Sequence, residues 1–123
     1  MNAKLLDGVS RPADFNKTVW LYWENKRKAK KPEYLELCLQ TIMKNSSGYN
    51  VNLLDDVSVN DYINIPPEIL KIKNIAHKAD WIRFSLLYEY GGIWLDSDVI
   101  LLREMAEIIE PYINDHDYLL VEP

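Results

Sequence analysis

The chain has 123 residues, of which 48% are hydrophobic and 27% are charged, and its formal net charge is −5. The length suffices for one domain with a modest core, and the negative charge argues against a nucleic-acid partner. Cys38 is the single cysteine, which excludes an internal disulfide and fits a reducing compartment. The N-terminus lacks the apolar core of a signal peptide, and no run approaches the ~20 apolar residues of a membrane span. We therefore expect a cytoplasmic protein.

The first half of the chain predicts a strand, a helix and a second strand. Residues 1–16 are polar and mixed, and we expect a loose lead-in before a single domain that spans residues 17–123. Residues 17–23 are dense in β-branched and aromatic side chains and predict the first strand. Pro32 can open a helix, and residues 49–54 alternate as a second strand does. A strand, a helix and a strand in this order predict a parallel pair.

Charged and polar residues follow each of these two strands. The basic run at residues 24–31 is typical of a solvated loop. It can also attract a diphosphate or an anionic membrane surface, which would allow peripheral association with the inner face of the membrane. Asp55 and Asp56 are interpreted as turn or helix-cap residues. Residues 57–63 predict a short helical turn, for which Ser58 is the expected N-cap.

The next helix carries a charged pair on its apolar side. At about 100° per residue, Arg83 projects near the middle of the apolar arc and Asp80 lies at its edge. A guanidinium there is costly unless it is paired, and the spacing of three residues puts Asp80 within reach. A purely internal ion pair explains this pattern as well as a functional one does. The apolar arc comprises Ile75, Ala79, Ile82, Leu86 and Tyr90, widened by Ala76 and Leu87.

Two aspartates follow a short strand. Gly91 and Gly92 stand where a helix C-cap needs a left-handed backbone, and the apolar residues 93–95 predict a buried strand. In an extended backbone alternate residues point the same way, so Asp96 and Asp98 should project together. Paired carboxylates call for a cation or a proton between them, and Mg²⁺ or Mn²⁺ binds one or two carboxylates plus substrate phosphates. An acidic turn is the alternative, but ligands bind at the carboxyl ends of strands in open α/β sheets.

The last quarter of the chain continues the same alternation. Residues 99–102 are apolar and predict a strand, residues 103–114 predict a helix that ends near Pro111, and residues 118–121 predict a last strand. The whole pattern predicts an α/β, Rossmann-like fold with a mostly parallel sheet and flanking helices.

The stretch around the two aspartates resembles the signature of DXD-motif glycosyltransferases with the GT-A fold. Within these enzymes it is most similar to the capsular polysaccharide synthesis and mannosyltransferase-like group. The resemblance covers only the N-terminal, donor-binding half of those enzymes, so it implies a truncated GT-A fold whose C-terminal acceptor half is absent. The matching positions are Asp80, Arg83, Gly91, Gly92, Trp94, Asp96 and Asp98.

The resemblance also implies a donor site and its cofactor. The donor would be a nucleotide-diphosphate sugar, linked to UDP or GDP, and the cofactor would be Mn²⁺ or Mg²⁺. Asp98 would bind the metal directly. Asp96 would hold ribose and sugar hydroxyls with a water-mediated contact to the metal. Asp80 and Arg83 would contact the donor sugar.

Aromatic residues would hold the nucleotide. By the same resemblance Trp94 would line the nucleotide pocket, and Trp20 would stack on the base, with Trp23 as the next candidate. Stacking on a base stabilises binding by ~1–3 kcal/mol in other systems. Core packing of at least one of these two strand tryptophans is the alternative interpretation.

The implied activity is transfer of a hexose from the nucleotide sugar to a glycan or lipid-linked acceptor, with retention, in bacterial capsular or surface polysaccharide synthesis. No catalytic base is identifiable. One alternative is an inactive fragment that only binds a nucleotide sugar or packs against a partner chain. Another is a phosphohydrolase of the haloacid-dehalogenase type with Asp96 as nucleophile, although Ile100 stands where that motif has Thr or Val.

Overall fold

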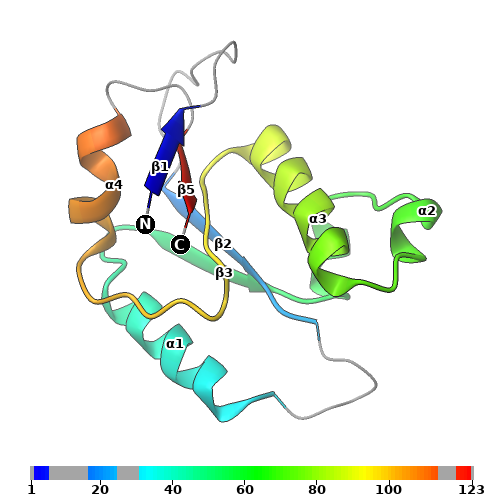
Figure 1. Cartoon of the computed structure of the whole chain (residues 1–123), viewed down its shortest axis with the longest axis horizontal. Helices are drawn as coiled ribbons and strands as arrows, with labels where there is room; N and C mark the ends of the chain where they lie inside the picture. The colour runs from blue at the N-terminus through cyan, green and yellow to red at the C-terminus, as the bar shows by residue number, and fades with distance from the viewer. Residues whose placement is uncertain (1, 6–16, 25–30, 114–118, 123) are drawn as a thin grey trace.

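A parallel sheet of three strands forms the centre of the structure (Figure 1). Strand β2 (Thr18–Tyr22) lies in the middle, with β3 (Asn50–Leu54) on one side and β4 (Ile93–Trp94) on the other. Both neighbours run parallel to β2, which confirms the predicted α/β, Rossmann-like architecture. Figure 1 shows the computed structural model of the chain, which describes residues 2–5, 17–24, 31–113 and 119–122.

Helices cover both faces of this sheet. Helices α1 (Glu33–Lys44) and α4 (Met105–Ile113) pack on one face, and α3 (Ile75–Tyr90) packs on the other (Figure 1). Helix α1 begins directly after Pro32, as predicted. Alternate residues of β2 point to opposite faces, so this strand contributes to both hydrophobic clusters. The first cluster includes Val19, Leu21, Ile42, Met105 and Ile109, and the second includes Trp20, Tyr22, Val59, Ile82 and Leu86.

Two short helices connect β3 to α3. The first, η2 (Ser58–Asp61), is the predicted helical turn, and α2 (Pro67–Leu70) follows it. The prediction that Ser58 caps η2 is wrong, because the Asp55 carboxylate accepts the backbone N–H groups of Val57 and Ser58 at 2.9 and 2.8 Å. These backbone hydrogen bonds hold the pKa of Asp55 below its ordinary value. The turn role predicted for Asp55 is confirmed.

The ends of the chain form a second, separate sheet. Strand β1 (Asn2–Leu5) pairs antiparallel with β5 (Leu119–Glu122), and β5 lies within one residue of the predicted last strand. The sequence did not predict β1, because a four-residue strand whose partner is at the other end of the chain has no local signal. Residues 6–16 of the expected lead-in lie outside the described residues.

The prediction of a strand over residues 99–102 is wrong. This segment has no ladder partner in the part of the chain that the structure describes. Side chains at the end of α1 and at its C-cap bind it instead: Leu101 donates its N–H to Thr41 Oγ1 at 3.0 Å, and its carbonyl accepts from Nδ2 of the C-cap residue Asn45 at 2.7 Å. Helix α4 then runs past Pro111 rather than ending there. No helix in the described ranges is long and apolar enough to cross a membrane.

Candidate functional site at the carboxyl ends of the strands

The direction in which the strand order grows reverses between β2 and β4. From β2 the chain moves to β3 on one side, and then crosses through α3 to β4 on the other side. Open parallel sheets bind ligands outside the carboxyl ends of the strands where the order reverses in this way. Trp23 and Glu24 directly follow β2, and Asp96 and Asp98 follow β4. These residues therefore mark the candidate site.

The end of α3 is fixed to the central strand. Gly91 ends the helix with a φ of 72°, as predicted, and its carbonyl accepts the indole N–H of Trp20 at 2.9 Å. Gly92 has a φ of 100°, and a Cβ at this position would lie 2.6 Å from the carbonyl oxygen of Thr18. Only glycine allows this left-handed backbone at so close an approach. The two glycines thus place β4 directly beside β2.

The acidic motif forms a turn. The carbonyl of Asp96 accepts the N–H of Val99 at 3.2 Å, which is the hydrogen bond of a β-turn. The prediction of an extended backbone from Asp96 to Asp98 is therefore wrong. Both aspartates are exposed, whereas Ser97 between them is buried. The indole N–H of Trp94 donates to Asp96 Oδ1 at 3.2 Å, so the last residue of β4 orients this carboxylate.

The donor set of this turn suits a metal ion that is shared with a ligand. Mg²⁺ and Mn²⁺ are commonly held by one or two carboxylates together with waters and substrate phosphates. Two exposed carboxylates on one turn, Asp96 and Asp98, meet that requirement. Within the described ranges, no group of three or more His, Cys, Asp or Glu side chains could hold a metal ion by itself.

The predicted charged pair of α3 is present. Arg83 Nη2 lies 3.3 Å from Asp80 Oδ1, and the guanidinium carbon lies 4.9 Å from the centre of the Phe84 ring. The Asp80 side chain is 57% exposed and that of Arg83 is 26% exposed. Arg83 Nε is buried and has no hydrogen-bond partner among the described residues. The arginine is therefore only partly satisfied, because such a donor normally finds a partner.

The cation that α3 buries most deeply is Lys78, which the sequence analysis missed. Its amine lies 2.8 Å from Glu24 Oε1, and the Tyr22 hydroxyl donates to Glu24 Oε2 at 2.7 Å. The available signal was its position one turn before Ile82 on the apolar arc. The predicted arc includes Ala76 in its place, and this residue is exposed.

The pKa values of Glu24 and of Tyr22 are both shifted from their ordinary values at this ion pair. Burial acts to raise the pKa of Glu24, but the hydrogen bonds from Lys78 and Tyr22 and the charge of Lys78 hold that pKa below its ordinary value. Burial raises the pKa of Tyr22, and the hydrogen bond to Glu24 and the nearby carboxylates raise it further. Residues 25–30 of the following basic run lie outside the described residues.

The two tryptophans of the first strand have different surroundings. Trp20 is 3% exposed and packs against Tyr62 and Tyr90, with ring centroids 5.2 and 5.7 Å away. The core-packing interpretation therefore describes Trp20 in this structure. Trp23 is partly exposed and lies just past the end of β2. Base stacking by either ring stays a prediction, and Trp23 is the better placed of the two.

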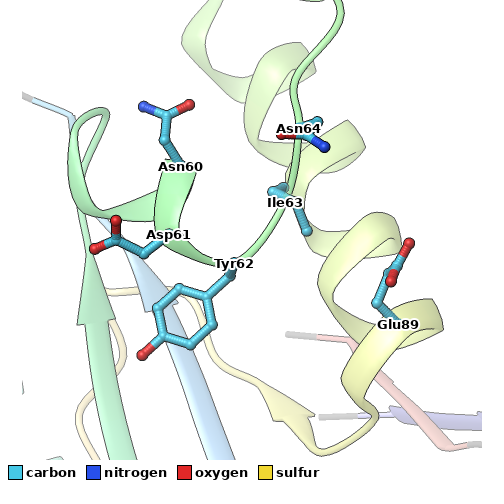
Figure 2. Close-up of a pocket in the computed structure, with 6 residues that line it drawn as sticks. All are labelled: Asn60, Asp61, Tyr62, Ile63, Asn64 and Glu89. Atoms are coloured by element: carbon cyan, nitrogen blue, oxygen red, sulfur yellow. The ribbon is translucent and has the colours of Figure 1, made fainter.

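A polar hollow of about 250 Å³ lies between η2 and the C-terminal part of α3 (Figure 2). Figure 2 shows the carboxylates of Asp61 and Glu89 on opposite sides of this hollow. They do not converge on a common point, so these two carboxylates do not form a metal site in the hollow. Its lining consists of Asn60, Asp61, Tyr62, Ile63, Asn64 and Glu89.

Comparison with known proteins finds a family match over most of the chain. Residues 7–121 match the family described as capsular polysaccharide synthesis protein. The chain is 28% identical over 111 residues to the O-glycosyltransferase PaGT of Phomopsis amygdali, a match that covers 80% of this chain and 27% of the relative. It is 27% identical over 117 residues to the O-glycosyltransferase braB of Annulohypoxylon truncatum, covering 85% of this chain and 28% of the relative.

A viral relative extends this comparison. An uncharacterized glycosyltransferase of Acanthamoeba polyphaga mimivirus is 27% identical over 97 residues, covering 74% of this chain and 37% of the relative. The chain thus spans between about a quarter and two fifths of the length of these relatives. No solved structure matches the chain.

Proposed function

Because the chain belongs to the capsular polysaccharide synthesis protein family, we propose that it is the donor-binding part of a glycosyltransferase of the GT-A type. The observation that carries this proposal is the position of the acidic turn. Asp96 and Asp98 follow β4 beside the carboxyl end of β2, where the strand order reverses. The relatives named as glycosyltransferases support the reaction class.

The proposed ligand is a nucleotide-diphosphate sugar bound together with Mn²⁺ or Mg²⁺. Asp98 and Asp96 hold the ion, which when bound neutralises the charge of the leaving diphosphate. Trp94 fixes the orientation of the Asp96 carboxylate through its indole N–H. Because the two carboxylates are exposed on a turn, they can approach the ion without displacing the core.

The remaining roles fall to α3 and to the end of β2. Asp80 and Arg83 bind hydroxyls of the donor sugar, for which the incompletely satisfied guanidinium has donor capacity left. Trp23 stacks on the base of the UDP or GDP moiety. The ion pair of Lys78 and Glu24 holds α3 against the end of β2, and thereby keeps Asp80 and Arg83 near Trp23.

The proposal extends to the whole reaction of a longer enzyme. The sugar passes with retention to a glycan or lipid-linked acceptor in the synthesis of a capsular or surface polysaccharide, at the inner face of the membrane. Among the described residues, the proposal assigns groups that bind the donor and assigns no catalytic base. The family match gives no support to the phosphohydrolase interpretation of Asp96.

Calorimetric titration of UDP- and GDP-sugars, with and without Mn²⁺, tests the proposal. We expect Mn²⁺-dependent binding by the wild-type protein that falls at least about tenfold in Asp98→Asn. Asp56→Asn serves as the matched control, because this exposed carboxylate follows β3 rather than β4. Binding that is independent of Mn²⁺, or equal in the two variants, would contradict the proposed site. Absence of binding by a folded wild-type protein would favour the inactive-fragment alternative.

A further inference from the structure

Trp20 of the central strand binds both ends of the segment that contains β4. Its indole N–H donates to the carbonyl of Gly91 at 2.9 Å, and its own backbone carbonyl accepts the N–H of Leu95 at 3.0 Å. Between these two positions, Trp20 pairs with Trp94 in the β2–β4 ladder. One residue of β2 therefore holds segment 91–95 at its first and at its last residue.

The indole hydrogen bond adds an attachment that the ladder does not supply. Among the described residues, β2 and β4 pair over two residues of each strand, so few hydrogen bonds oppose local opening of this edge. The bond to Gly91 holds the chain before β4, at the point where it leaves α3. An indole that turned away from Gly91 would leave a buried N–H without its partner, which is costly.

Neighbouring rings hold the Trp20 side chain in this orientation. The centroid of the Tyr62 ring lies 5.2 Å away, with the two rings nearly perpendicular, and that of the Tyr90 ring lies 5.7 Å away. The hydroxyl of Tyr90 donates to the carbonyl of Tyr62, which joins these two neighbours. Stacking on a nucleotide base needs an exposed ring face, whereas Trp20 is 3% exposed. Contact with a base would require Trp20 to leave both this cluster and the carbonyl of Gly91.

The residues that Trp20 holds lead directly into the acidic turn. Leu95 immediately precedes Asp96. Trp94, the ladder partner of Trp20, donates its indole N–H to Asp96 Oδ1 at 3.2 Å. A shift of β4 relative to β2 would therefore move the Asp96 carboxylate. Ligand groups that are already in place bind more tightly, because less ordering accompanies binding.

We propose that Trp20 is a positioning residue of the donor site, which holds both ends of segment 91–95 and thereby sets the position of Asp96 without contacting the donor. Its effect on donor affinity rests on the proposed glycosyltransferase function, whereas its effect on β4 rests only on the contacts of Trp20. Base stacking at the end of β2 then falls to Trp23.

Amide hydrogen exchange, measured by NMR on the ligand-free chain, tests the effect on β4. The variant carries β-(3-benzothienyl)alanine in place of Trp20, which keeps the shape of the ring and lacks the N–H, so the packing is conserved. We expect the amide of Leu95 to exchange about fivefold faster than in the wild-type protein, as the loss of one hydrogen bond implies. The amide of Trp23, bonded to the carbonyl of Leu54 at 2.9 Å, should keep its rate.

The same replacement at Trp81 is the matched control. Trp81 packs against the same hydrophobic cluster as Trp20, and its indole has no hydrogen-bond partner in the part of the chain that the structure describes. Exchange at Leu95 should be unchanged in this control. Calorimetric titration with UDP- and GDP-sugars and Mn²⁺ should show about fivefold weaker binding in the Trp20 variant only. A stacking role of Trp20 would survive the replacement, because the ring face is retained.

Three results would overturn the proposal. The first is an unchanged exchange rate at Leu95 in the Trp20 variant. The second is an equal increase at Trp23, because the indole N–H would then stabilise the fold as a whole. The third is wild-type donor affinity despite faster exchange at Leu95. If the wild-type protein binds no nucleotide sugar, the proposed function fails, and the exchange rates alone decide whether Trp20 holds β4.

Discussion

The amine of Lys78 lies 2.8 Å from the carboxylate of Glu24, 54 residues earlier in the chain. The contact joins α3 to the segment that leaves β2 at its carboxyl end. Both side chains are largely buried, with 11% and 15% exposure. The hydroxyl of Tyr22, a residue of β2, donates a hydrogen bond to the other oxygen of the same carboxylate. The pair thus connects α3, which carries Asp80, to the segment directly after the central strand β2.

Removing one member of this pair should destabilise the protein strongly. Lys78→Met leaves the Glu24 carboxylate buried without its partner, and we expect a loss of about 3 kcal/mol in the free energy of unfolding. Adding Glu24→Gln removes the unpaired charge, so the double variant should recover part of this loss. Urea denaturation of both single variants and the double variant gives the coupling energy. Additive losses would mean that the two groups do not interact.

The same pair predicts a specific pH dependence. Because the pKa of Glu24 is held below its ordinary value of 4.5, its contribution to stability is complete above that pH and is lost as the pH falls through the folded-state pKa. The difference in unfolding free energy between wild type and Glu24→Gln should therefore shrink below about pH 4.5. Urea titrations at a series of pH values measure it. Glu68→Gln, an exposed control on α2, should show no such narrowing; a constant difference for Glu24→Gln would refute the linkage.

Gly92→Ala should destabilise the protein more than Gly48→Ala. Both glycines have positive φ values, 100° and 80°, so alanine is strained at either position by about 1–2 kcal/mol. At Gly92 the new Cβ would also lie 2.6 Å from the Thr18 carbonyl oxygen, whereas at Gly48 nothing lies within 4 Å. The backbone of β2 or β4 must move in the first case only. Equal unfolding free energies for the two variants would show that the close approach is absent.

The variant Asp80→Ala should show whether Asp80 contacts the donor sugar or only stabilises the fold. Because the Asp80 side chain is 57% exposed, its removal should change the free energy of unfolding by less than about 1 kcal/mol. If Asp80 binds the donor sugar, affinity for the nucleotide sugar should fall while affinity for the corresponding nucleoside diphosphate stays the same. Calorimetry with the two ligands makes the comparison. An equal loss for both ligands would place Asp80 at the nucleotide instead.

Local patterns in the sequence were sufficient to predict most of the elements at the carboxyl edge of the sheet. The glycine pair, the strand before Asp96 and the Asp80–Arg83 pair each have a signal within a few adjacent residues of the sequence, and the structure contains all three. The family resemblance used the same residues. Helical periodicity placed Ile82 and Leu86 on the buried side of α3 correctly, whereas Ala76 and Tyr90 of the predicted arc are exposed.

Contacts between distant segments were the ones that the sequence did not show. Residues 99–102 are as apolar as a strand, but Thr41 and Asn45 of α1 occupy the backbone groups of Leu101. Local patterns allowed no prediction for Lys78, because its partner, Glu24, lies 54 residues away at the start of a run of charges after β2. Strand β1 depends in the same way on β5. Each outcome is determined by a tertiary partner rather than by local propensity.

Strand β4 has only two residues, and it is the strand on which the acidic turn is mounted. The N–H of Leu95, bonded to the carbonyl of Trp20 at 3.0 Å, extends its attachment by one residue. A ladder this short can open locally at a small fraction of the free energy of global unfolding. The amide of Leu95 should then exchange with solvent faster than that of Leu21 in the central strand. Local opening of the β2–β4 ladder would move the Asp96 carboxylate while the longer β2–β3 ladder stays paired, so the acidic turn can change position without unfolding of the domain.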